Sequence, residues 1–287
     1  MRAEPKTAQS GAVGTRSITR TTLTYVLIGV VTAGFAFPFI VMLATAFKGP
    51  EEIFSLPPRI LPEVWVFDNF GLAAESVPIP RYFLNTLIVA GACVLGTLIS
   101  CPPVGYALAK LRWPGRGLLF TVVVGTMMLP PQVTFIPLYL VFDRIGLVGT
   151  FWPLILPPLF GTPFFIFLMR QFFLAVPTEL IEAARIDGAS ELRIYAQIIL
   201  PLAKPALATI AVFQFMWAWT DFMNPLIYLK NEEMYTLSLG LNAFFSTYGV
   251  AWGPLMAASV MFTIPALVIF LFGQRFFLSG IATTGLK

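Results

Sequence analysis

The chain has 287 residues, of which 57% are hydrophobic and only 11% are charged. Soluble domains average about a quarter charged residues, so this composition argues against a water-soluble fold and predicts an all-α polytopic membrane protein. The formal net charge of +4 gives no reason to expect a nucleic-acid partner. The absence of histidine excludes His-based acid–base catalysis and the commonest metal ligand.

The first 21 residues are polar and contain four basic side chains, Arg2, Lys6, Arg16 and Arg20. This pattern predicts a cytoplasmic tail over 1–21. Because no cleavable signal peptide is evident, the first apolar segment is expected to serve as an uncleaved anchor.

Six apolar segments have the roughly 20 residues that a helix needs to cross a bilayer. We predict spanning helices at 22–47, 82–109, 118–142, 151–175, 205–229 and 254–278, which form one membrane domain over 22–278. Prolines interrupt the third and fourth segments, and proline kinks or breaks a helix. A broken helix pair would suit a path that opens and closes; ordinary kinked packing is the alternative.

Lysines and arginines predict the orientation. With the N-terminus inside, 13 of the 18 basic residues lie in inner segments, which leaves 5 outside. Both termini, including the tail 279–287, and the insert 176–204 are therefore expected in the cytoplasm. The outer loop 48–80 is rich in proline and is expected to have short extended or turn structure.

Two cysteines, Cys93 and Cys101, lie in one predicted helix. Eight helical residues separate them by about 12 Å along the axis, so they cannot form a disulfide with each other. Buried apolar packing is the expected role of both.

The insert is polar although its flanks are apolar, and residues 179–201 read ELIEAARIDGASELRIYAQIILP. Thr178 is a candidate N-cap of a first short helix, Gly188 a left-handed C-cap, and Ser190 the N-cap of a second helix. Ala183 and Ala184 would let another backbone approach closely. An interfacial helix without a partner is the alternative, but the acidic residues of the insert would be repelled by anionic headgroups.

Seven residues of the insert fit the spacing EAA-x3-G-x9-I-x-LP, namely Glu182, Ala183, Ala184, Gly188, Ile198, Leu200 and Pro201. This pattern resembles the signature loop of the membrane-spanning permease subunits of binding-protein-dependent ABC importers. The Pro-rich outer loop before Asp68-Asn69-Phe70, together with the C-terminal segment, is similar to the carbohydrate (maltose-type) group. The resemblance implies a coupling helix that contacts an ATPase subunit through Glu182, Ala183, Ala184, Asp187, Gly188 and Ala189. Ile198, Leu200 and Pro201 would support the loop.

The same resemblance implies an inner-membrane permease of a bacterium that passes a sugar or related solute by alternating access. Its partners would be a second homologous permease, two ATP-binding cassette subunits and an extracytoplasmic solute-binding protein, all around a lipid bilayer. The chain has no Gly-x4-Gly-Lys-Ser/Thr phosphate loop, so ATP and Mg²⁺ are expected on the partners and no cofactor on this chain. No catalytic residue and no metal site are expected.

The run WAWTDFMNPL, late in the fifth predicted span, places Asp221 near Trp219 and Asn224. A carboxylate inside a membrane usually faces water or a partner, and aromatic rings with an amide and a carboxylate suit a sugar. Asp221 is therefore expected to be structural, to contact substrate, or simply to lie at the interface. Gln214 is expected to line the path or to form an interhelical hydrogen bond, and Trp217 to belong to the aromatic belt.

Other functions remain open. The solute could be a polyol, glycerol phosphate or an amino acid. An ion-coupled secondary transporter would need several intramembrane acids, and only Asp221 qualifies. A membrane enzyme would need a cluster of catalytic polar residues, which the sequence does not show.

Overall fold

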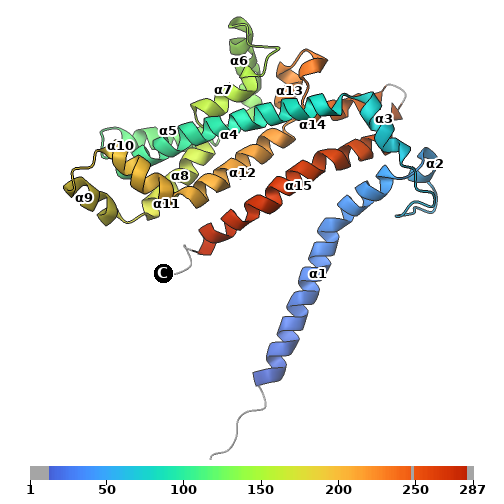
Figure 1. Cartoon of the computed structure of the whole chain (residues 1–287), viewed down its shortest axis with the longest axis horizontal. Helices are drawn as coiled ribbons and strands as arrows, with labels where there is room; N and C mark the ends of the chain where they lie inside the picture. The colour runs from blue at the N-terminus through green and yellow to red at the C-terminus, as the bar shows by residue number, and fades with distance from the viewer. Residues whose placement is uncertain (1–12, 247–248, 283–287) are drawn as a thin grey trace, which may run out of the picture. The chain divides into compact units, whose positions relative to one another are not determined.

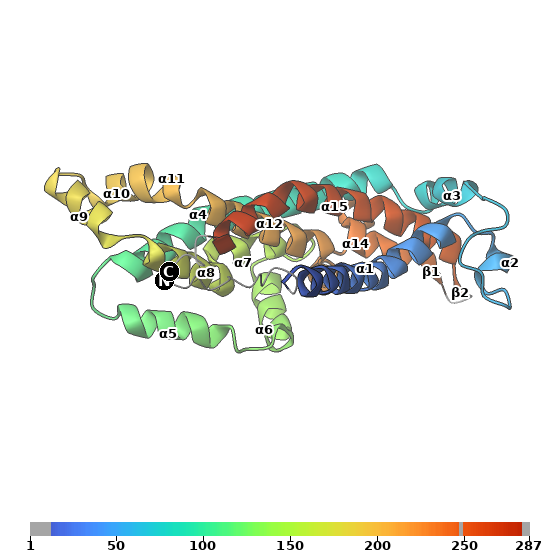
Figure 2. The same cartoon turned by 90° about the horizontal axis from the view of Figure 1, so that it is seen from below.

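The computed structural model describes residues 13–246 and 249–282, so most of the predicted tail 1–21 and the end of 279–287 lie outside the described residues. The chain divides into two compact units. One comprises residues up to 71 together with 251–260, and the other comprises 72–250 together with the residues from 261 onward. Figures 1 and 2 show the chain from two directions.

Three of the predicted spans are long continuous helices. They are α1 (Val13–Ala46), α4 (Ile79–Lys110) and α15 (Trp252–Ala282), and each is long and apolar enough to cross a membrane. The fourth span consists of α7 (Trp152–Phe160) and α8 (Pro163–Ala175), which together also qualify as one span. Gly161 joins them with a φ of +105°, a conformation that glycine adopts without steric cost.

The third predicted span is not one helix. It consists of α5 (Arg116–Thr126) and α6 (Pro131–Arg144), whose axes are bent by 100°. Pro130 lies at the break with an extended backbone and directly precedes Pro131. A residue before proline is driven out of the helical region, so this pair of prolines stops α5 and starts α6 in a new direction.

The fifth predicted span is also broken. α12 (Lys204–Thr220) ends before Asp221, whose backbone is extended, and α13 (Met223–Tyr228) follows. The prediction of a single helix over 205–229 is therefore wrong at residues 221–222. α12 itself follows α11 (Leu200–Leu202) after a bend of 75°.

The outer loop 48–80 contains two helices, α2 (Pro50–Ile53) and α3 (Asp68–Ser76), which corrects the expectation of extended or turn structure there. Asp68 lies in the first turn of α3, where a carboxylate is favourable for the helix dipole. Asn69 fixes the start of α3 to the end of α1, because its side-chain amide donates to the carbonyl oxygens of Ala46 and Lys48 at 3.0 and 2.9 Å.

The segment between α13 and α15 forms short elements. They are a 3₁₀ turn (Glu232–Met234), α14 (Leu237–Gly240), a second 3₁₀ turn (Leu241–Phe244) and the antiparallel pair β1 (Phe245–Ser246) and β2 (Gly249–Val250).

The core of the larger unit forms around α4, against which α7, α8 and α12 pack. Two glycines of α4 allow this close packing. A Cβ at Gly96 would lie 3.0 Å from the Leu159 backbone, and one at Gly105 would lie 2.8 Å from the Cβ of Met169. Cys93 and Cys101 are both buried and free, as predicted.

Candidate functional site

The insert 176–204 lies at one end of the bundle formed by α4, α8 and α12, whereas α13 and α14 lie toward the opposite end (Figures 1 and 2). It contains α9 (Thr178–Ile186), α10 (Glu191–Ile194), a π-helical turn (Tyr195–Ile199) and α11. The two short helices of the predicted helix–Gly–helix pattern are therefore present.

Gly188 ends α9 in the conformation predicted for it. Its φ is +80°, and it follows Asp187 at the C-cap. The Gly188 N–H donates to the Arg185 carbonyl and the Ala189 N–H to the Ala184 carbonyl, both at 3.0 Å. These two bonds are the Schellman motif, which satisfies the last carbonyls of a helix.

The N-terminus of α9 differs from the prediction. Pro177 occupies the N-cap position, Thr178 is already helical, and no side chain caps the helix. Pro177 ends α8 and sets the chain direction into α9, because its fixed φ suits a helix start. The second cap is as predicted: the Ser190 hydroxyl accepts from the Arg193 N–H at 3.4 Å.

α9 has one buried face and one exposed face. Ile181 and Ala184 point into the core, with 1% and 8% of their surface exposed. Glu182, Ala183 and Asp187 are exposed, and Ala189 is half-buried. The sequence predicts a small apolar face made of Leu180, Ile181, Ala183 and Ala184. Of its two alanines, only Ala183 is available to a partner, because Ala184 is buried. The exposed face also carries two large apolar side chains, Leu180 and Ile186, and Leu192 of α10 is exposed as well.

The residues predicted to support the loop are Ile198, Leu200 and Pro201. The π-helical turn at Tyr195–Ile199 changes which side chains of this segment are buried. Ile194 and Ile199 are both fully buried, whereas Ile198 is only partly buried against the same core. The sequence predicts Ile194 and Ile198 one turn apart on a common face. The buried position is instead Ile199, one residue later, since a π turn adds one residue to the helical repeat. Leu200 is half-buried and Pro201 is exposed.

An ion pair connects the two helices of the insert across the glycine turn. Arg185 Nε donates to Glu191 Oε1 at 2.6 Å, and the Tyr106 hydroxyl of α4 donates to the other carboxylate oxygen at 3.2 Å. The hydrogen bond between the two charged groups raises the pKa of Arg185 and lowers the pKa of Glu191. One carboxylate therefore connects α9, α10 and the C-terminal end of α4.

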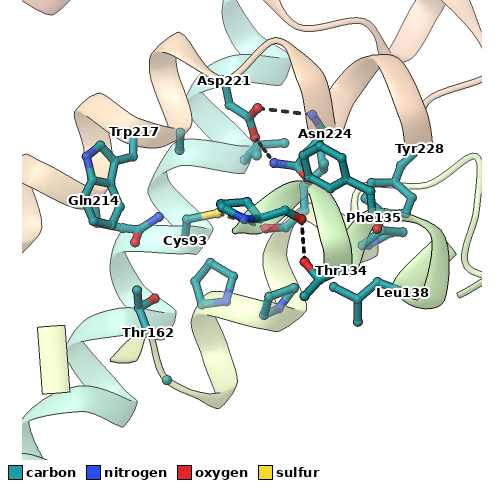
Figure 3. A pocket seen from close by; sticks show the side chains of 18 of the residues that line it. Cys93, Thr134, Phe135, Leu138, Thr162, Gln214, Trp217, Asp221, Asn224 and Tyr228 are labelled. Atoms are coloured by element: carbon teal, nitrogen blue, oxygen red, sulfur yellow. Dashed lines mark hydrogen bonds between the residues drawn. The ribbon is translucent and has the colours of Figure 1, made fainter. Parts of the chain in front are cut away.

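A second candidate site is a cavity of about 340 Å³ near the break between α12 and α13 (Figure 3). We call it the Asp221 cavity. Residues of α4, α6, α7, α12 and α13 line it. α12 and the residue that follows it contribute Gln214, Trp217, Ala218 and Asp221, whose spacing of i, i+3, i+4 and i+7 places them on one helix face.

Asp221 and Asn224 point toward each other in this cavity (Figure 3). One carboxylate oxygen of Asp221 accepts from the Asn224 backbone N–H at 3.2 Å, and the other accepts from the Asn224 side-chain amide at 2.8 Å. The backbone oxygen of Asp221 accepts a hydrogen bond from the Ser238 hydroxyl. Asp221 thus accepts a hydrogen bond from a backbone N–H in the first turn of α13, and it also presents its carboxylate to the cavity.

Gln214 and Trp219 occupy different surroundings. Gln214 lines the cavity and accepts a hydrogen bond from Thr97 of α4 at 3.2 Å, so it both lines the cavity and links two helices. Trp219 is buried away from the cavity, where its indole N–H donates to the Phe262 carbonyl at 3.1 Å. The structure therefore separates Trp219 from the other three residues proposed for the path.

Several lining residues were not expected from the sequence. Trp217 was expected in the aromatic belt, but it borders the cavity and packs on Phe165 with ring centroids 4.8 Å apart. Thr134 and Phe135 reach the cavity from α6. The helical spacing from Gln214 to Asp221 could have indicated Trp217, but no local signal indicates α6.

Among the described residues, no group of three or more Cys, Asp or Glu side chains could hold a metal ion. The arrangement offers two features instead. One is an exposed short helix with a rigid glycine turn, and the other is a polar and aromatic cavity toward the opposite end of the same helices.

Residues 102–282 match the family described as binding-protein-dependent transport system inner membrane component. The chain belongs to this family. It is therefore the membrane-spanning component of an ABC importer and, like its relatives, a permease rather than an ATPase.

Two curated relatives illustrate the range of the family. The arabinooligosaccharides transport system permease protein AraQ of Bacillus subtilis is 33% identical over 256 residues, covering 88% of this chain and 91% of the relative. The sn-glycerol-3-phosphate transport system permease protein UgpE of Yersinia pestis bv. Antiqua is 32% identical over 253 residues, which cover 85% of this chain and 90% of the relative.

A solved structure shares the fold. It is the crystal structure of a bacterial ABC transporter involved in the import of the acidic polysaccharide alginate, with a TM-score of 0.78 and 24% identity. The match covers 94% of this chain and 100% of that chain. This similarity supports the all-α permease fold expected from the sequence.

Proposed function

We propose that this permease carries a carbohydrate, delivered by an extracytoplasmic binding protein, into the cytoplasm of a bacterium, driven by ATP hydrolysis on two partner subunits. The observation that carries the coupling part is the α9–Gly188–α10 insert, which exposes apolar side chains at one end of the bundle. The carbohydrate part is supported by the relative that transports arabinooligosaccharides.

The exposed face of α9 is the proposed contact with the ATPase. Leu180 and Ile186 are 46% and 87% exposed and flank the small Ala183. A clustered apolar surface beside acidic side chains suits a groove of a protein partner, with Glu182 and Asp187 at its edge. ATP and Mg²⁺ bind the partner, and no cofactor binds this chain.

Movement of α9 reaches the membrane helices through specific contacts. Ile181 and Ala184 are packed into the core that contains α4 and α8, and Glu191 bonds both Arg185 and Tyr106. Because these packed contacts are rigid, a push on α9 moves the inner end of α4 with it.

The Asp221 cavity is the proposed part of the path that this chain supplies. Its volume lies at the lower end of the range for small-molecule sites, which is roughly 300 to 1,000 Å³. Trp217 and Phe135 offer rings for the apolar faces of a sugar, and Gln214, Asp221 and Asn224 offer hydrogen-bonding groups for hydroxyls. A second permease subunit would complete the path.

The distribution of basic residues supports the proposed orientation. Both termini and the insert lie in the cytoplasm, and the loop 48–80 lies outside. A thiol-reactive reagent that cannot cross membranes tests this. In a chain with Cys93 and Cys101 replaced by alanine, Ala183→Cys should react only after cells are opened, whereas Ser76→Cys should react in intact cells.

Transport itself decides the function. Uptake of labelled arabino-, chito- and malto-oligosaccharides and of sn-glycerol 3-phosphate would be measured in cells with and without the gene. We expect oligosaccharide uptake that requires the gene and stops when ATP is depleted. Uptake of glycerol phosphate alone would support the non-sugar alternative, and uptake that follows the proton gradient and ignores ATP would indicate a secondary transporter.

A further inference from the structure

A second, larger cavity lies beside the insert, where α4 ends and α5 begins. Its volume is about 720 Å³, and α4, the turn 111–115, α5, α8, α9 and α10 border it. We call it the basic cavity, because four of its lining residues are cations: Lys110, Arg112, Arg116 and Arg185. Two lining residues, Glu182 and Glu191, are anions.

The cations of the basic cavity are incompletely neutralised. Glu191 is paired with Arg185 at 2.6 Å. Lys110 instead donates to the neutral Val176 carbonyl at 2.6 Å, and Arg116 donates to the Leu111 carbonyl at 2.9 Å. Within the described part of the chain, no ion pair involves Lys110, Arg112 or Arg116. Among the lining residues, three cations therefore face the single unpaired carboxylate of Glu182, which also acts on Arg185. Glu179, outside the lining, acts electrostatically on Lys110.

The basic cavity lies at a membrane boundary. α4 is a candidate span that ends at Lys110, and the bent pair α5–α6 begins its span at Arg116. Gly115, with a φ of +87°, turns the chain sharply between them. Trp113 lies in this turn and is partly exposed, with its indole N–H bonded to the Ala107 carbonyl at 3.3 Å. Tryptophan next to arginine is typical of the headgroup level of a bilayer.

Below the basic cavity, α5 offers an apolar surface. No residue of α5 is buried in this chain. Leu118, Leu119 and Val122 are 72%, 45% and 53% exposed, all within the first two turns after Arg116. A ligand that fits both features has a negative headgroup for the cations and hydrocarbon for α5, which is the chemistry of an anionic phospholipid.

We propose that the basic cavity binds the phosphate headgroup of an anionic phospholipid such as phosphatidylglycerol, whose acyl chains lie along α5. Basic cavities between helices at the cytoplasmic face are suited to such headgroups. The uncapped N-terminus of α5 adds a favourable dipole for the phosphate. This inference rests on the proposed orientation of the chain in the membrane, but it is independent of the solute carried.

The position of the basic cavity gives the bound lipid a role in coupling. Thr178, Glu182 and Arg185 of α9 form one wall, and Lys110 and Arg112 form the other. A phosphate between these walls would screen the like charges of Arg112 and Arg185. The lipid would thereby hold the coupling helix against the inner end of α4.

Lipid binding can be measured on the purified full-length chain in detergent. Fluorescently labelled phosphatidylglycerol is titrated against the wild type and against Arg112→Gln and Arg112→Gln/Arg116→Gln. Because each cation near the headgroup contributes about five-fold in affinity, we expect about five-fold and about thirty-fold weaker binding. Arg112 forms no hydrogen bond among those described, so its single variant tests the charge without disturbing the turn.

A double variant with the same loss of charge is the control. Arg144→Gln/Lys230→Gln removes two exposed cations outside the basic cavity and should leave binding unchanged. Labelled phosphatidylcholine should bind at least ten-fold more weakly than phosphatidylglycerol, and millimolar inorganic phosphate should not displace the lipid.

Four results would overturn the proposal. The first is equal affinity for phosphatidylglycerol and phosphatidylcholine, and the second is an equal effect of the cavity variants and the control variant on lipid affinity. The third is full displacement of the lipid by inorganic phosphate. The fourth is an Arg112→Gln variant that binds lipid as the wild type does but no longer co-purifies with the ATPase. The last result would assign the basic cavity to an acidic segment of the ATPase instead. None of these results depends on transport, so a failed uptake experiment leaves this test intact.

Discussion

Replacement of Gly188 tests the coupling turn most sharply. Its φ of +80° lies in the left-handed region, and a Cβ placed there would have no other atom within 4 Å. Any penalty is therefore conformational rather than steric. A left-handed backbone costs an L-residue roughly 1–2 kcal/mol, and a β-branched residue is still less tolerated.

This magnitude translates into function. A penalty of that size lowers the equilibrium ratio of intact to disrupted turns by about 5- to 30-fold. Gly188→Val should therefore lose at least five-fold in ATP-dependent uptake, while its membrane insertion and yield stay at wild-type levels because nothing packs against the position. Gly188→Asn is the matched control, since asparagine tolerates left-handed backbone, and it should transport nearly as well as the wild type.

The assay is solute uptake and ATP hydrolysis by the complete transporter in proteoliposomes. We expect Gly188→Val to hydrolyse ATP without matching transport. Wild-type uptake by Gly188→Val would refute the reasoning. Equal loss in the Val and Asn variants would also refute it, because the side chain rather than the backbone would then be responsible.

Three further predictions concern the fold and the cavity. Asp221→Ala removes the hydrogen-bond acceptor at the start of α13, so it should lower the free energy of unfolding by about 1 kcal/mol and also reduce uptake. Asp221→Asn should reduce uptake with little change in melting temperature. Identical melting temperatures of the wild type and both variants would contradict this. Gly105→Val would place a methyl group against the backbone of α8, so it should lower the free energy of unfolding by about 1–3 kcal/mol. The expected readout is a lower melting temperature and a lower yield. Gly91→Val on the same helix, with open space around it, should be tolerated. Because the pKa of Glu191 is lowered, its pair with Arg185 contributes fully above the ordinary carboxyl pKa of about 4.3, and this contribution is lost as the pH falls through the lowered pKa. The difference in unfolding free energy between the wild type and Glu191→Gln, less than about 1 kcal/mol for a half-exposed pair, should therefore be largest at neutral pH and shrink as the pH falls below about 4.3. A difference that does not shrink on acidification would show that the pair is not its source.

The parts of the fold that local chemistry determines could be predicted from the sequence. The insert is an example, because Pro177, Gly188 and Ser190 act on their own neighbours. Three details of it were wrong: the cap at Thr178, the exposure of Ala184, and the common face of Ile194 and Ile198, which the π-helical turn shifts. The continuous spans are another, since length and apolar composition decide them.

The parts that distant contacts determine could not be predicted. The break at Asp221 is stabilised by Ser238, which is 17 residues away in the sequence. The position of α6 beside the Asp221 cavity depends on the direction that the chain takes after Pro130. The sequence predicts a helix break at this proline, but it does not predict the angle between α5 and α6.

The most direct test of the account is a crosslink from the exposed face of α9. In a chain without Cys93 and Cys101, Ala183→Cys would carry a short photoactivatable reagent in the complete transporter. The account predicts a crosslink to the ATPase subunit whose yield changes with ATP, and none from Ser76→Cys in the outer loop. Normal transport without any crosslink from α9 to the ATPase would contradict it.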